Sequence, residues 1–290
     1  MAADRTPVRH GLTGLWPALL AAGLLWLAAP AALAWAPMPW GLATVWWDFP
    51  AETAAFHSLS LDIDIEGEEI GERRLYFALI GAEEIDGAPL YAGLQSGANL
   101  ADGKSGHIAI FSRWNERSRE AIRLAPGSYG QSAGYEGDFI GVRHPVPWRQ
   151  GRYRISLIAE PPQAGDPRPW VRMEVLELAS GKSWQVGALR FPAGPEARLG
   201  RSLASFVEAF GPPISAQSLP RITVRLDNLR INDRPIQPTG GLALYKEDVP
   251  PVAEVRIAGP GAVLIEIGRM VDHSTLPLDS KGRRNQRLRW

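Results

Sequence analysis

Apolar and polar residues alternate along much of the chain from residue 59 onward. In residues 59–65, Leu and Ile occupy every second position, with Ser and Asp between them. The same period of two recurs in residues 75–79, 153–160 and 171–177. Because successive side chains of a β-strand point to opposite faces, each segment is predicted to be a strand with one buried and one wet face. Residues 106–114 are apolar on both faces, which predicts a strand in the middle of a sheet.

Turn residues indicate how some of these strands connect. A Ser-Gly-Lys turn at residues 180–182 predicts a hairpin between residues 171–177 and 184–191. A Gly-Pro-Gly turn at residues 259–261 predicts that the strand before it pairs with residues 263–267. Near Asp227-Asn228 the apolar positions change phase, which predicts a β-bulge.

One stretch has a helical period. Apolar side chains recur at spacings of four, three and four, at Leu199, Leu203, Phe206 and Phe210. Many short strands and a single helix predict an all-β chain. We expect a two-sheet antiparallel sandwich of jelly-roll or concanavalin-like type, with roughly a dozen strands.

The domain organisation follows from composition. The sandwich is predicted to occupy residues 35–240, and a change of composition after residues 238–241 predicts a small β appendage over residues 241–290. The basic tail, residues 281–290, is expected to be disordered.

The first segment has the pattern of a secretory signal peptide. Arg5 and Arg9 precede residues 15–33, an apolar run without a charge, which closes on Ala32-Leu33-Ala34. This order of basic start, apolar middle and small-x-small exit predicts cleavage after Ala34 and a secreted or periplasmic mature chain. The alternative is an uncleaved membrane anchor, because the run is nearly long enough to span a bilayer. No later segment is apolar enough to cross a membrane.

Composition excludes several partners and cofactors. Lys and Arg total 31 and Asp and Glu total 31, so the chain lacks the basic excess that nucleic-acid binding requires. There is no Cys, hence no disulfide, thiolate metal site or cysteine nucleophile. The five His are too dispersed for a histidine metal site, and no cofactor is expected.

Three short motifs resemble ligand-binding loops without completing them. Residues 103–105 and 181–183 both read Gly-Lys-Ser, but Ala98 and Leu176 stand where a phosphate-binding loop needs its first glycine. Residues 62–67 resemble the start of a calcium-binding loop, whose twelfth position is Arg73 instead of Glu. The two Gly-Lys-Ser segments are predicted to be turns, and the acidic run a solvated strand face.

Paired carboxylates are the best candidates for catalysis. Glu136 and Asp138 are two residues apart, and with Glu208 they could supply the acid and nucleophile of sugar hydrolysis. The third acid of the E-x-D-x-x-E pattern is absent, because Gly141 occupies its position. The alternative is that Glu136 accepts hydrogen bonds from backbone N–H groups in its own Gly-rich turn.

Aromatic residues suggest a platform for sugar rings. Trp114, Tyr135 and Trp148 are predicted to bind ligand together with Arg113 and Glu136, and Trp148 is placed near the surface because a turn follows it. The alternative is that these rings are core residues, which is the commoner role of Trp in a sandwich.

Several short motifs occur in an order that suggests a family. They are residues 91–95 (YAGLQ), 110–115 (IFSRWN), 134–137 (GYEG), 148–153 (WRQGRY) and 205–210 (SFVEAF). In these motifs the chain resembles a bacterial exported family, domain of unknown function 3472. The resemblance implies a lectin-like β-sandwich and an association with glycans. The chain departs from the family at Asp138-Phe139-Ile140, where a glycine-rich run would follow the acid.

These observations lead to one hypothesis and two alternatives. The first is an extracytoplasmic binding module for a polysaccharide or cell-envelope glycan. The second is a glycoside hydrolase or polysaccharide lyase using Glu136 with Glu208 or Asp138, and the third is a structural envelope protein without a ligand. Two converging carboxylates beside tryptophan would favour the enzyme, an aromatic groove without that pair would favour binding, and a flat polar surface would favour the structural role.

Overall fold

The segments with a period of two form strands because their apolar side chains pack inward on one face. On β2 (Ser58–Gly67), Leu59, Leu61, Ile63 and Ile65 are fully buried. On β9 (Gly151–Ala159) the inward positions are buried in the same way, and the outward positions between them are partly exposed. The alternation therefore predicted both the strands and the faces that they bury.

The computed structural model describes residues 38–49, 55–135, 137–161, 165, 168–192, 197–200 and 202–290. Two features of the sequence analysis lie outside this part of the chain. They are the predicted signal peptide, residues 1–34, with its cleavage site, and the candidate site residue Glu136. Eighteen strands occur in it, more than the dozen expected, together with two short 3₁₀ helices. In chain order these elements are β1 (Trp40–Asp48), β2 (Ser58–Gly67), β3 (Leu75–Ile85), β4 (Ala88–Asn99), β5 (Ser105–Trp114), η1 (Arg119–Ala121), β6 (Ile122–Leu124), β7 (Tyr129–Ala133), β8 (Phe139–Pro145), β9 (Gly151–Ala159), β10 (Trp170–Glu177), β11 (Ser183–Arg190), β12 (Leu203–Ala209), η2 (Ala216–Ser218), β13 (Ile222–Ile231), β14 (Arg234–Pro235), β15 (Gly240–Lys246), β16 (Ala253–Gly259), β17 (Ala262–Ile267) and β18 (Arg283–Leu288).

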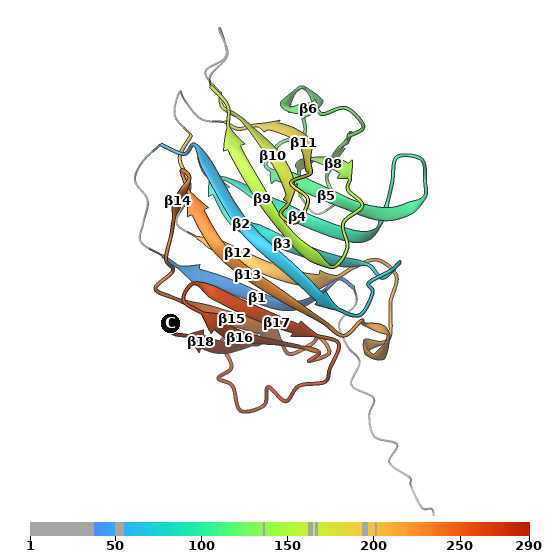
Figure 1. The fold of residues 1–290 in the computed structure, drawn as a ribbon, viewed down its shortest axis with the longest axis vertical. Coiled ribbons are helices and arrows are strands. Elements are labelled where there is room, and N and C mark those ends of the chain that lie inside the picture. The colour runs from blue at the N-terminus through green and yellow to red at the C-terminus, as the bar shows by residue number, and fades with distance from the viewer. Residues whose placement is uncertain are drawn as a thin grey trace, which may run out of the picture. The chain divides into compact units, whose positions relative to one another are not determined.

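The strands form two large antiparallel sheets packed as a sandwich, which confirms the predicted fold class (Figure 1). The first sheet has the order β18-β15-β1-β12-β3-β4-β5-β8-β7. The second has the order β16-β17-β13-β2-β9-β10-β11-β6, with β14 paired to β13. In Figure 1 the blue β2 lies between the yellow-green β9 and the orange β13, although these strands are far apart in the chain. The core lies between the sheets and takes buried residues from both.

The connections predicted from turns are confirmed. β10 and β11 form the expected hairpin. On β16, Val255 pairs with Ile265 and Ile257 pairs with Val263 of β17. The pairing of β13 with β2 shifts register between Asp227 and Arg230, at the predicted bulge.

The predicted helix is wrong. Residues 203–209 form strand β12, which lies between β1 and β3 in the first sheet. Leu203, Ser205 and Val207 are buried on the core side, whereas Phe206 packs against Tyr76 in a separate cluster on the other face. Apolar residues on both faces of the strand produced spacings that resemble a helical period.

The C-terminal segment is part of the sandwich, so the predicted appendage and disordered tail are corrected. β15 pairs with β1 in the first sheet, and β17 pairs with β13 in the second. The basic tail forms β18, which pairs with β15 along six residues. Its apolar side chains explain its order, because Leu288 is buried and the Trp290 ring stacks on Trp47 at a centroid distance of 6.1 Å.

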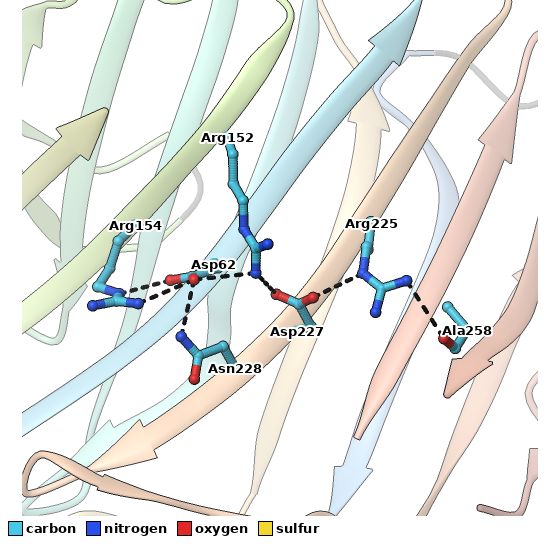
Figure 2. A network of polar contacts seen from close by, with 7 residues as sticks. All are labelled: Asp62, Arg152, Arg154, Arg225, Asp227, Asn228 and Ala258. Carbon is cyan, nitrogen blue, oxygen red and sulfur yellow. Dashed lines mark hydrogen bonds and ion pairs between the residues drawn. The ribbon is translucent and has the colours of Figure 1, made fainter. Parts of the chain in front are cut away.

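The acidic run on β2 is also less solvated than its sequence predicts. The Asp62 side chain is only 2% exposed, although it points away from the core. Arg154 donates two hydrogen bonds to its carboxylate, at 2.7 and 3.1 Å, and Asn228 donates a third at 3.0 Å (Figure 2). Long arginine side chains from the neighbouring strand therefore cover a position that alternation alone would leave wet.

The rest of this polar network runs across three strands of the second sheet. Arg152 bridges Asp62 and Asp227, and Arg225 donates to the other oxygen of Asp227 at 2.7 Å (Figure 2). Each carboxylate thus has more than one charged donor.

No helix in the described part of the chain has the length and hydrophobicity needed to span a bilayer.

Candidate functional site

The outer face of the first sheet gathers side chains from strands that are distant in sequence. The pairing of β12, β3 and β4 places Glu208 opposite Tyr76, and Tyr76 opposite Gln95. Since side chains at paired positions share a face, a carboxylate, a phenol and an amide lie in one row. Beside this row, Ala78 of β3 pairs with Gly93 of β4. A Cβ on Gly93 would lie 1.9 Å from the Phe77 carbonyl oxygen, so only glycine fits there.

Tyr76, Gln95 and Glu208 line a groove with a cavity volume of about 590 Å³. Its walls come from strands β3, β4, β5, β7, β8 and β12 and from the segments next to them. Its aromatic lining consists of Tyr76, Tyr91, Trp114, Tyr135, Phe139, Phe206 and Phe210. Its polar lining consists of Arg74, Gln95, Asn99, Ser112, Gln131, Arg143 and Glu208.

Six of the rings form a continuous series of contacts, which we call the aromatic path. In order they are Tyr76, Phe206, Tyr91, Trp114, Phe139 and Tyr135. Successive ring centroids are 5.4, 5.3, 4.5, 5.7 and 5.3 Å apart, within the range of favourable aromatic pairs. The path ends at Tyr135, which is 68% exposed. Mutual packing holds the inner rings in place, so a ligand would meet a preformed surface.

Polar groups in the groove carry unused hydrogen-bonding capacity. The Gln131 amide nitrogen donates to the Tyr135 hydroxyl at 3.1 Å. Its carbonyl oxygen is buried and accepts no hydrogen bond from any residue that the structure describes. A buried acceptor without a donor is costly.

Tyr76 is held in its neutral form. Burial raises the pKa of Tyr76 well above its usual value, and the nearby charge of Glu208 raises it further, whereas Arg143 opposes the rise. At neutral pH the Tyr76 hydroxyl therefore keeps its proton and can donate a hydrogen bond.

The structure brings three of the predicted site residues together. Trp114, Tyr135 and Glu208 all line the groove. Asp138 does not line it, because its carboxylate points to Arg117 at 3.2 Å and is largely exposed. Glu136 lies outside the described residues, so the pairing of its carboxylate with Glu208 stays a prediction.

Trp148 lies in the core, contrary to its expected place near the surface. It is 1% exposed, and its ring meets Phe77 edge to face at 5.7 Å. The indole N–H donates to the Ile108 carbonyl at 3.2 Å. Val146 and Trp148 are buried whereas Pro147 and Arg149 are exposed, so the Trp148 ring points inward from a surface segment, which the turn itself does not indicate.

Arg113 also faces the core and not the groove. Its side chain is 5% exposed, donates to the Arg190 carbonyl and lies over the Phe191 ring at 5.3 Å. Adjacent residues of a strand point to opposite faces, so Arg113 and Trp114 could not both enter one site. The alternation of side chains along β5 could have shown that only one of these two residues faces the groove.

Sequence reasoning missed several lining residues. Tyr91 and Gln95 lie four residues apart on β4 and therefore share a face, which their spacing could have shown. Phe206 was assigned to the predicted helix, so its place on the outer face of a strand was not expected. Arg143 and Gln131 carry no local signal, because only the pairing of β8 with β5 and β7 brings them to the groove.

Two smaller hollows adjoin the groove. One, of about 200 Å³, shares Tyr91 and Phe206 with it and is also lined by Trp46 and Lys246. The other, of about 410 Å³, shares Tyr91 and is lined by Trp46 and Glu83. Among the residues that the structure describes, no cluster of three or more His, Asp or Glu side chains could hold a metal ion.

Comparisons with known proteins do not assign this site. No family model matches the chain, and no curated protein matches it. The resemblance to the exported family of domain of unknown function 3472 therefore stays a prediction.

Proposed function

We propose that this protein is an extracytoplasmic glycan-binding module and that the groove on the first sheet is its binding site. The aromatic path carries the proposal. Sugar rings have apolar C–H faces and polar hydroxyl edges, so they pack on aromatic rings while their hydroxyls pair with amides. Gln95, Gln131 and Asn99 supply such amides along the groove.

The carboxylates favour binding over cleavage. Glycoside hydrolysis by the common mechanisms needs two carboxyl groups on either side of the scissile bond. Among the described residues that line the groove, Glu208 is the one carboxylate. Asp138, the second described candidate, faces Arg117. The enzyme hypothesis then depends on Glu136, and binding requires no such partner.

The structural hypothesis has less support. A protein with a purely structural role would not need a hollow lined by seven aromatic residues. Large aromatic surfaces left open on a protein are typical of ligand or partner sites.

The extracytoplasmic location is part of the proposal and rests on residues 1–34. In a bacterial host the exported chain should begin at Trp35, which N-terminal sequencing of the periplasmic and secreted fractions would test. Full-length protein retained in the inner membrane would contradict it.

Substitution of two rings of the aromatic path tests the binding site. Tyr135→Ala and Trp114→Ala should each weaken polysaccharide binding about 2- to 10-fold, the value of one aromatic contact. Tyr135→Ala should leave the melting temperature unchanged, because the ring is 68% exposed. Binding is measured by affinity electrophoresis or calorimetry against a panel of neutral and acidic polysaccharides.

Trp184→Ala is the matched control. Trp184 is a partly buried tryptophan on β11 of the second sheet, where Lys182 lies over its ring. It should not affect binding. Equal losses in the Trp114 and Trp184 variants, or unchanged binding in both groove variants, would contradict the proposal.

A further inference from the structure

Arg143 is one of the charged groups that line the groove. It lies on β8, opposite Ile110 of β5 and Tyr129 of β7. Both Arg143 and Ile110 line the groove. Its guanidinium makes no hydrogen bond or ion pair with any residue that the structure describes. Elsewhere, the arginines of the network around Asp62 all have carboxylate partners.

The phenol hydroxyls beside Arg143 carry no negative charge. The positive charge of Arg143 lowers the pKa of Tyr76 and of Tyr129, but burial outweighs it and both hydroxyls stay neutral. The Tyr129 hydroxyl donates to the Asn99 carbonyl at 2.8 Å, so it is already engaged. Arg143 therefore lies beside neutral phenols, which do not pair with it as anions.

The remaining charges of the groove leave a positive excess. Its described lining holds two guanidinium groups, Arg74 and Arg143, and one carboxylate, Glu208. Among the residues that the structure describes, Arg74 donates a hydrogen bond to the side-chain oxygen of Asn99, at 3.5 Å, and pairs with no carboxylate. In the adjoining smaller hollow the charged groups are Lys246 and Arg283, and Arg283 is paired with Asp279 at 2.7 Å.

A partly desolvated guanidinium without an anion is an incomplete interaction. Its planar fork of donors matches the two oxygens of a carboxylate, and such charge-assisted pairs are stronger than neutral hydrogen bonds. The rings of the aromatic path lie in the same groove and suit a sugar. We propose that the groove binds an acidic polysaccharide and that Arg143 pairs with the anionic group of one of its sugars. This inference rests on the proposed glycan-binding function.

A panel of polysaccharides tests it with the mature protein. The acidic members are polygalacturonate, alginate and dextran sulfate, and the neutral members are fully methyl-esterified polygalacturonate and dextran. Wild-type protein should bind an acidic member at least tenfold more tightly than its neutral counterpart. Its affinity should fall as salt is raised. Preference for a uronate over dextran sulfate identifies the anion as a carboxylate, and the reverse identifies a sulfate.

Arg143→Gln should weaken binding of the acidic member about 10- to 100-fold and flatten its salt dependence. Arg143→Lys keeps the charge without the fork and should lose less. Arg256→Gln is the control for removing a positive charge, because Arg256 is an exposed residue of β16 on the second sheet. It should bind as the wild type does.

The outcomes separate this inference from the function on which it rests. Equal binding of acidic and neutral members, or an Arg143→Gln variant that binds as the wild type does, would overturn the proposal that Arg143 pairs with an acidic polysaccharide. Losses in the Tyr135 and Trp114 variants would then still support a glycan site. No binding to any member of the panel would overturn both.

Discussion

At the scale of single residues, Glu83 on β3 shows how burial controls one ionisable group. It is fully buried, and one of its carboxyl oxygens has no hydrogen-bond partner in the described structure. The other accepts from the Glu84 N–H at 2.8 Å. Burial raises the pKa of Glu83 to about 8, and backbone hydrogen bonds from Glu84 and Gly200 offset only part of the rise. The carboxyl is therefore mostly protonated at neutral pH.

The pH dependence of stability follows from this pKa. The unfolded chain releases the Glu83 proton near 4.5, whereas the folded chain holds it up to about 8. The contribution of Glu83 is therefore greatest below pH 4.5 and is lost as pH rises to 8. The free energy of unfolding should fall over this window by an amount on the order of 2–4 kcal/mol.

Glu83→Gln should remove this fall in the free energy of unfolding with rising pH, as measured by urea unfolding at several values between pH 5 and 8. Glu69→Gln is the control, because Glu69 is an exposed carboxylate. A Glu83→Gln variant with the same slope as the wild type would show that the carboxyl is ionised at neutral pH.

At the scale of elements, β18 shows how a charged segment becomes an edge strand. Five of its six residues are polar, but Leu288 faces the core and is 1% exposed. Arg287 faces outward and pairs with Asp48 at 3.0 Å. One apolar anchor and a full set of backbone pairs with β15 therefore order a segment whose composition indicates a solvated tail.

Substitutions at neighbouring positions of β18 should have opposite outcomes. Leu288→Ala should cost about 2–5 kcal/mol, the usual range for a buried leucine. Arg287→Ala should cost at most about 1 kcal/mol, because its ion pair is exposed to solvent. Chemical denaturation of both variants measures the difference. Two neutral substitutions would indicate that the tail is disordered in solution.

At the scale of the whole sandwich, the two outer faces differ in chemistry. The first sheet carries the open aromatic groove. On the second sheet, Asp62 and Asp227 share the guanidinium groups of three arginines, so both carboxylates are already paired (Figure 2). We therefore expect ligand binding on one face and a contribution to stability alone from the network on the other.

This division predicts that a substitution in the network changes stability alone and that one in the groove changes binding alone. Asp62→Asn should lower the free energy of unfolding by about 2–4 kcal/mol, because it leaves Arg154 without its charged partner, and should leave polysaccharide affinity unchanged. Tyr135→Ala should do the reverse. Asp64→Asn, on the same strand face without a hydrogen bond to described residues, should change neither by more than about 0.5 kcal/mol. Loss of binding in the Asp62 variant at a temperature where it is folded would contradict the division.

The sequence by itself determined the strands, many of their turns and the fold class. Alternation such as that of residues 59–65 is a local property, because the pleat of a strand sets which side chains share a face. The turn at residues 259–261 and the bulge after Asp227 are equally local. The same information was enough to single out Trp114, Tyr135 and Glu208, which the groove brings together.

Only the tertiary structure decided which strands pair, and hence the rest of the candidate site. Glu208 meets Tyr76 because β12 lies beside β3, a choice that no short-range pattern records. The same non-local pairing gave β12 apolar residues on both faces and put β18 into the sheet. Burial likewise took Trp148 and Arg113 from the predicted site into the core. The physical reason is that strand periodicity acts over neighbouring residues, whereas pairing and burial depend on contacts between residues far apart in the chain.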